Sequence, residues 1–325
     1  MAAVLVKPDD FTNDLKNPAR PTFLFGVTPP RDGTTHEKAR EILTKFCARS
    51  SVLATDGFIV YDIQDEKGRV EADRPFPFRK TLDPSWYGSL FPEIAGKHCI
   101  VYKSVVEESV EKFDQWIDTA RLEHGHTAFN LVGAPTSKLQ YQGPSLEEAG
   151  HMTRVKPHCD FGCVCIAERH GKRNEAKAMV MKIDWGAEWF ISQGVYSAGP
   201  IIKLLNDYGD LCRARGILPK KVIITFAPCG RQKTMTFIKW LGMAVPEEVE
   251  QRMFAAESPV LESIEILCEI LQTILEQTGG SGVPLGINVE SLSIFKEEID
   301  AAHTLFRRLQ VGGMVGRAIY TICCV

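Results

Sequence analysis

Residues 166–193 bring together four side-chain types that could do chemistry. His170 is an imidazole, Glu175 a carboxylate, Lys182 an ammonium group and Gln193 an amide. The stretch runs from the end of one apolar strand, through a helical pattern, to a second strand. In a barrel of parallel strands, residues near the carboxyl ends of the strands form the active site. We therefore expect these side chains to contact a ligand.

Each of these residues also has a structural alternative. A buried amide such as Gln193 must find partners, so it could hydrogen-bond a neighbouring loop instead of a ligand. Lys182 could be a solvated helix charge, or it could serve as a point charge for phosphate. His170 could contact a cofactor or cap the helix that follows it.

Eight short segments rich in Val, Ile and Phe recur along the chain, and most are followed by a helical pattern. Such strands are buried on both faces, as in parallel sheets. The pattern predicts an α/β fold, a single-domain (β/α)8 TIM barrel. A doubly wound sheet is the alternative, but it usually carries a Gly-rich turn after its first strand, where this chain has Thr28, Pro29 and Pro30. The expected strands cover residues 22–28, 57–63, 99–105, 127–133, 162–168, 189–195, 221–227 and 285–289.

We expect the barrel to form one catalytic domain over residues 22–310. Residues 1–21 are polar and proline-containing, so we expect an irregular lead-in there. Residues 311–325 form an apolar C-terminal tail that could pack on the body. Residues 64–96 are expected to form a long connection, and loops of that length are usually functional.

Composition excludes several classes of partner. The chain has 325 residues and a formal net charge of −3, which gives no electrostatic argument for nucleic acid or an acidic membrane. Its start is too polar for a signal peptide, and no apolar run of about 18 residues is present, so no membrane span is expected. Ten cysteines without a secretory signal favour the reducing cytoplasm.

A zinc site is one interpretation of a group of potential ligands in the middle of the chain. Cys163 and Cys165 alternate on one expected strand, close to His158 and Cys159. The usual CxxC spacing of zinc ligands is absent, however, and free cysteine is a common core residue. We therefore interpret these cysteines as core residues and expect no metal.

Several short motifs, in order, resemble the methylenetetrahydrofolate reductase family. They are Pro-Pro-Arg at 29–31, Asn-Leu-Val-Gly at 130–133, Glu-Arg-His at 168–170, Lys-Ile-Asp-Trp-Gly-Ala at 182–187, Phe-Ile-Ser-Gln at 190–193, then Pro228, Phe237 and Val-Pro at 245–246. The resemblance covers about residues 22–310 and is firmer from residue 166 onward. It implies a flavin-binding (β/α)8 barrel that reduces 5,10-methylenetetrahydrofolate to the 5-methyl form. The electrons would pass from NAD(P)H through FAD.

The resemblance also implies roles for individual residues. Gln193 would hydrogen-bond the pterin of a small-molecule folate substrate, and Phe237 would stack on the pterin or the nicotinamide. Gly133 would let the backbone approach the flavin. The contacts to the ribityl, phosphate or adenosine parts of FAD would come from His170, Glu175 and Lys182.

The sequence departs from the family at two positions that matter for chemistry. The family's general acid on the first strand is replaced by Gly26, and the aspartate that tunes the flavin is replaced by Ala134. Opening the 5,10-bridge needs an acid with a pKa raised by burial. The carboxylates expected at other strand ends are Asp62, Glu168 and Glu290. We favour Glu290 as the catalytic acid, because Asn288 and Glu290 alternate and should face one side; an ion pair at the barrel mouth is the structural alternative.

Two functions from different classes remain open. The first is an NAD(P)H-dependent oxidoreductase of the methylenetetrahydrofolate reductase type, with FAD or, given Ala134, by direct hydride transfer. The second is a folate-binding barrel that lacks reductase chemistry and acts as a methyl-transfer enzyme or a binding or regulatory protein, which Gly26 favours. The preference for NADH or NADPH and the oligomeric state are left open, a homo-oligomer included.

Overall fold

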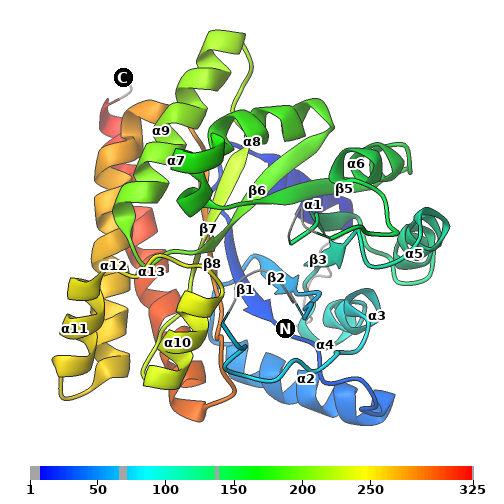
Figure 1. The fold of residues 1–325 in the computed structure, drawn as a ribbon, viewed down its shortest axis with the longest axis horizontal. Coiled ribbons are helices and arrows are strands. Elements are labelled where there is room, and N and C mark those ends of the chain that lie inside the picture. Colours follow the sequence, from blue (N-terminus) through cyan, green and yellow to red (C-terminus); the bar gives the residue numbers. More distant parts are fainter. Residues whose placement is uncertain (1–7, 66–71, 136–138, 324–325) are drawn as a thin grey trace. The chain divides into compact units, whose positions relative to one another are not determined.

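Eight parallel strands follow one another in chain order and close into a barrel (Figure 1). The computed structural model describes residues 8–65, 72–135 and 139–323. This arrangement confirms the predicted (β/α)8 fold. The strands are β1 (Phe23–Val27), β2 (Gly57–Val60), β3 (Cys99–Ser104), β4 (Ala128–Val132), β5 (Asp160–Cys165), β6 (Ala187–Gly194), β7 (Lys221–Phe226) and β8 (Leu285–Val289).

Helices follow the strands, and several begin at the capping residues that the sequence shows. The side chains of Thr35, Ser109 and Ser145 each accept a hydrogen bond from a backbone N–H in the first helical turn. Ser145 and Glu148 complete a reciprocal capping box. The α-helices are α1 (Pro8–Lys16), α2 (His36–Ser50), α3 (Pro84–Gly88), α4 (Phe91–Ala95), α5 (Val110–Leu122), α6 (Leu146–Arg154), α7 (His170–Arg173), α8 (Glu175–Asp184), α9 (Ala198–Arg215), α10 (Gln232–Trp240), α11 (Glu247–Ala255), α12 (Pro259–Thr278) and α13 (Lys296–Cys323).

The chain divides into two compact units. The first comprises residues 1–17, 24–164 and 182–189. In it β1 to β5 pair in register, with Ile59 opposite Ile100 and Asn130 opposite Gly162. Phe58 of β2 packs on the helices outside the sheet, with ring centroids 5.8 Å from Phe46 and 4.5 Å from Phe91.

The second unit comprises residues 18–23, 165–181 and 190–325. Its β7 and β8 pair along their whole length, from Val222 opposite Leu285 to Phe226 opposite Val289. Helices α12 and α13 pack side by side (Figure 1). Helix α11 ends at Ala255, and α12 begins at Pro259.

Three sequence predictions about irregular segments are corrected by the structure. The lead-in contains α1, and its buried Phe11 and Leu15 show that an apolar face holds this helix in place. The long connection contains α3 and α4, while residues 66–71 of it lie outside the described residues. The expected C-terminal tail begins inside α13, which continues to Cys323, so the described part of the tail is helical.

Two further observations concern partners. Within the described residues, no helix combines the length and apolar character that a membrane span requires. Nor do those residues contain a group of three or more His, Cys, Asp or Glu side chains placed to hold a metal ion. Cys159, Cys163 and Cys165 are buried free thiols.

Candidate functional site

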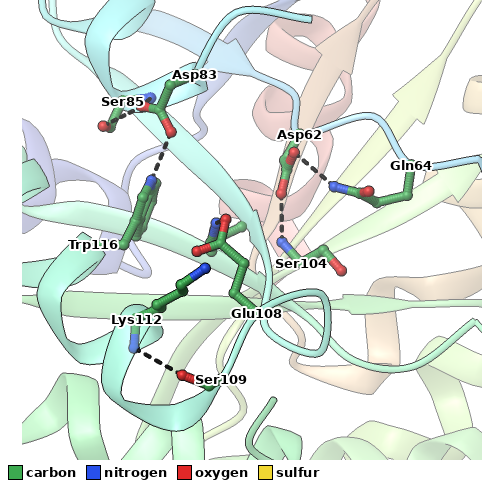
Figure 2. Close-up of polar contacts among 10 residues, drawn as sticks. Asp62, Gln64, Asp83, Ser85, Ser104, Glu108, Ser109, Lys112 and Trp116 are labelled. Carbon is green, nitrogen blue, oxygen red and sulfur yellow. Dashed lines mark hydrogen bonds and ion pairs between the residues drawn. The ribbon is translucent and has the colours of Figure 1, made fainter. Parts of the chain in front are cut away.

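A polar cluster in the first unit lies around the carboxyl ends of β2 and β3 (Figure 2). Asp62 follows β2, and its Oδ2 accepts a hydrogen bond from the backbone N–H of Ser104 at 2.8 Å. Its Oδ1 accepts one from Nε2 of Gln64 at 2.9 Å. The carboxylate is therefore held in one orientation, at the barrel end where active sites of this fold form.

Asp62 is the carboxyl group whose environment fits proton donation. Burial raises the pKa of Asp62 from 3.8 to about 6, although Lys103 and the Ser104 amide oppose the shift. The negative charges of Asp83 and Glu107 raise the pKa further. A carboxyl group with such a pKa is partly protonated near neutral pH and can serve as a general acid.

Lys103 is the buried cation of this cluster. It lies on β3 and is 7% exposed. Its Nζ lies 4.9 Å from the centre of the Trp116 ring and 3.8 Å from Oε1 of Glu108. The indole of Trp116 in turn donates to Asp83 at 2.7 Å. Lysine is seldom buried this far without partners, so the aromatic ring and the carboxylates together explain its position.

Asp83 behaves differently from Asp62. Desolvation opposes its ionisation, but hydrogen bonds from Ser85, Trp116 and the Trp86 amide lower the pKa of Asp83 below its usual value. Figure 2 shows Asp83 between Ser85 and Trp116. Neighbouring carboxylates whose environments push their pKa values apart are typical of acid–base sites.

The raised pKa of Asp62 predicts a pH-dependent stability. The folded chain retains the Asp62 proton between about pH 4 and 6, where the unfolded chain has lost it, so Asp62 lowers stability as the pH rises through this window. Above pH 7, Asp62→Asn is therefore expected to be more stable than the wild type, on the order of 1–2 kcal/mol. The gain should vanish below pH 4. Calorimetric unfolding at several pH values measures it, and a gain that is independent of pH would contradict this origin.

In the second unit, Gln193 near the end of β6 is tied to the helix that carries Phe237. Its Nε2 donates to the carbonyl of Leu241 at 2.6 Å, and Leu241 caps α10. Its Oε1 is buried and has no hydrogen-bond partner within the described residues. Phe237 stacks on Trp240 with ring centroids 6.0 Å apart. The Oε1 of Gln193 is thus an acceptor without a partner in the described part of this region.

The polar residues predicted to hold FAD are engaged within the protein. His170 Nε2 lies 2.7 Å from Oδ2 of Asp207, and His170 Nδ1 accepts from the Ala176 amide. Glu175 is buried and accepts from the Ile166 amide at 3.3 Å. In the first unit, Lys182 donates to the Val164 carbonyl at 2.8 Å. These hydrogen bonds hold the three side chains within the protein.

Gly133 differs from those polar residues. A Cβ added to it would meet only Leu146, at 3.5 Å or more. The space beside its backbone is therefore not filled tightly by the protein.

The other candidate acids lie in different settings. Glu168 is not on a strand, because β5 ends at Cys165; Glu168 lies in the 3-10 helix of residues 167–169 and accepts from the Ala244 amide at 3.1 Å. The backbone N–H of Glu290 donates to Phe226, directly after β8. The role of Glu290 as acid stays a prediction.

Lys103 and Asp83 are site residues that the sequence interpretation missed. A signal for Lys103 existed: it is the charged residue inside the apolar run Cys-Ile-Val-Tyr-Lys-Ser-Val-Val. Asp83 gave no such signal, because it lies in the segment interpreted as a loop. Only the fold brings it to Trp116, which is distant in the chain.

The comparisons with known proteins include a solved structure that matches nearly the whole chain. No family model matches the sequence, and neither does any curated protein. A protein of Clostridium thermocellum, described as uncharacterized and as binding two copies of 5-methyl-5,6,7,8-tetrahydrofolic acid, has a similar structure. The TM-score is 0.76 with 28% identity, over 93% of this chain and 97% of that chain.

Two enzymes with barrel folds are more distant. The lyase of 2,3-dimethylmalate gives a TM-score of 0.45 at 12% identity, over 96% of this chain and 100% of its own. The dihydropteroate synthase of Xanthomonas albilineans gives a TM-score of 0.39 at 13% identity, over 90% of this chain and 94% of its own. These values are too low to support an argument about function.

Proposed function

We propose that this chain binds a reduced folate of the 5-methyltetrahydrofolate type, and that it does so without a resident flavin. The observation that carries the proposal is the similarity to the Clostridium thermocellum protein, which extends over nearly the whole of both chains. The motifs that resemble methylenetetrahydrofolate reductases support a folate ligand independently of that match.

The chemistry of Gln193 supports a pterin as the part of the ligand that is recognised. A pterin carries N–H donors on its pyrimidine ring, and the buried Oε1 of Gln193 is an acceptor without a partner in the described structure. The Nε2 of the same amide is fixed on Leu241, so the acceptor is held in place before a ligand arrives. Pre-oriented groups of this kind cost little to use in binding.

The flavin is left out of the proposal because of the contacts made by His170, Glu175 and Lys182. Each of these side chains hydrogen-bonds within the protein. Ala134, in place of the family's aspartate, points the same way. FAD stays a prediction of the family resemblance, and the visible absorption of the purified protein tests it, because bound oxidised flavin is coloured.

A second candidate function is favoured by Asp62: reduction of 5,10-methylenetetrahydrofolate by NAD(P)H directly. A proton on N10 breaks its bond to the bridging carbon and leaves an iminium at N5. A hydride from the nicotinamide then adds to that carbon, giving the 5-methyl group and NAD(P)⁺. Asp62, with a pKa of about 6, is the described carboxyl group suited to supply the proton. A binding or methyl-transfer protein would not need this proton.

Titration calorimetry of the purified chain with 5-methyltetrahydrofolate tests the proposed function. We expect saturable binding by a colourless protein. Gln193→Ala should weaken binding about tenfold, the value of one hydrogen bond to the ligand. Failure of the wild-type chain to bind any reduced folate would overturn the proposal.

Two further variants separate the contact of Gln193 with the ligand from its hydrogen bond to the Leu241 carbonyl. Gln193→Glu keeps an acceptor oxygen but loses the donor to Leu241, so it should bind better than Gln193→Ala if the acceptor contacts the pterin. Gln251→Ala removes an exposed amide on α11, which is bonded to Glu247 and serves as the control. Unfolding temperatures should be recorded for all three variants.

A further inference from the structure

On the premise that the chain binds a reduced folate, we propose that Asn130 and the Trp189 indole read the lactam edge of the pterin, its N3–H and C4=O. Asn130 lies on β4 and Trp189 on β6, both in the first unit. Both side chains are fully buried. The Asn130 Oδ1 and Nδ2 and the Trp189 Nε1 have no hydrogen-bond partner within the described structure.

Unpartnered polar groups at such depth are costly for the folded chain. A buried donor or acceptor without a partner has lost its hydrogen bonds to water and gained none in return. Native proteins satisfy most such groups, so an orphaned amide and an orphaned indole near each other require a reason. A ligand that supplies the missing partners is such a reason.

Gly162 brings the two groups within reach of one ligand edge. It is the register partner of Asn130 on β5. The Trp189 Nε1 lies only 2.1 Å from the position that a Cβ on Gly162 would occupy. Since neighbouring strands are about 5 Å apart, the indole N–H lies roughly 3–7 Å from the Asn130 Cβ. A polar ligand group placed between them can therefore meet both side chains.

The donors and acceptors match a lactam. A primary amide offers one acceptor and two N–H donors, and an indole offers one donor. The C4=O of a pterin can accept from Asn130 Nδ2 and from Trp189 Nε1, while its N3–H donates to Asn130 Oδ1. A 4-amino pterin would present a donor to these donors and would lack the N3 proton. Buried polar groups left unpaired in this way reject a ligand strongly.

A pair of tyrosines lies beside Asn130. Tyr102 is the register partner of Asn130 on β3 and is itself buried. It makes an edge-to-face contact with the partly exposed Tyr61, with ring centroids 4.8 Å apart.

The experiment compares two ligands that differ at the 4-position. Dissociation constants of the wild type are measured for 5-methyltetrahydrofolate and for its 4-amino analogue. The 4-oxo compound is expected to bind at least about tenfold more tightly. In Asn130→Leu this preference should fall to within about twofold, while the unfolding temperature stays the same or rises, because an unpaired buried amide is replaced by an apolar group of similar shape. Asn206 on α9 serves as the control, because its amide donates to the Gln277 carbonyl. Asn206→Leu should keep the preference.

The outcomes separate this inference from the proposed function. If the wild type binds both compounds equally well, or if Asn130→Leu keeps the preference, the inference is wrong and folate binding stands. If Asn130→Leu lowers the unfolding temperature and leaves the preference unchanged, Asn130 has a structural role only. If neither compound binds the wild type, the proposed function itself fails. Trp189→Phe provides a second variant in case Asn130→Leu does not fold. It should weaken the binding of the 4-oxo compound and leave the binding of the 4-amino analogue unchanged.

Discussion

Replacing Asp62 by asparagine is expected to lower the rate of NAD(P)H-dependent reduction of 5,10-methylenetetrahydrofolate by about 100-fold or more, the usual contribution of a general acid. The side chain keeps its size and can still accept from the Ser104 amide, but it has no proton to give. The affinity for 5-methyltetrahydrofolate should change by less than about twofold, because this product needs no proton transfer. Steady-state rates and a binding titration on the same preparation test both statements.

The pH dependence of the wild-type rate gives an independent check. With a pKa of about 6 for Asp62, the rate should fall as the pH rises above that value and the proton donor is lost. Glu290→Gln is the matched comparison, since Glu290 is the acid that the sequence favours. If Glu290→Gln abolishes turnover and Asp62→Asn does not, the proton comes from Glu290. If the wild type reduces no folate at all, the enzyme candidate is lost and folate binding remains.

Adding one methyl group at Gly162 is expected to destabilise the chain by about 3 kcal/mol, the upper end of the usual cost of overpacking a core. The new Cβ would lie 2.1 Å from both Cδ1 and Nε1 of Trp189, and the indole is fully buried. Chemical denaturation of Gly162→Ala measures the loss. Adding Trp189→Leu should restore part of it, because the smaller side chain frees the clashing volume.

Gly133→Ala is the matched control for this substitution. Gly133 follows β4, and a Cβ there would make ordinary contact with Leu146 at 3.5 Å. Its stability should stay within about 0.5 kcal/mol of the wild type. A comparable loss in both variants would show that the close fit of Trp189 against Gly162 is not the cause. Because the fold tolerates this change, any loss of ligand binding in Gly133→Ala would reflect an approach of the ligand to this backbone.

The sequence predicted the elements of the barrel well, because their signals are local. Apolar runs such as Lys-Val-Ile-Ile-Thr-Phe at β7 and the cap at Ser145 act on neighbours in the chain. The break between α11 and α12 follows from Pro259 for the same reason. Helix α1 escaped prediction because a single short turn of apolar residues, Phe11 and Leu15, needs tertiary packing to be stable.

The candidate site was predicted less completely, because its properties depend on contacts between distant residues. Gln193 was chosen from the sequence as an amide on a strand, but only the structure leaves its Oε1 without a partner. Asn130 lay inside a motif noticed for its glycine, and nothing in the sequence tells that its amide is unpaired. His170 was predicted to contact a cofactor, and only the structure shows its pairing with Asp207 on α9.

By itself, then, the sequence determined the eightfold alternation of strand and helix and a set of polar residues near strand ends. Backbone propensity, capping and apolar periodicity act over a few residues, so they can be seen in the chain order. The tertiary structure decided which of those residues still have unused hydrogen-bonding capacity and which carboxyl group has a raised pKa. Both depend on burial and on partners such as Ser104 beside Asp62 or Trp189 against Gly162, which only the closed fold brings together.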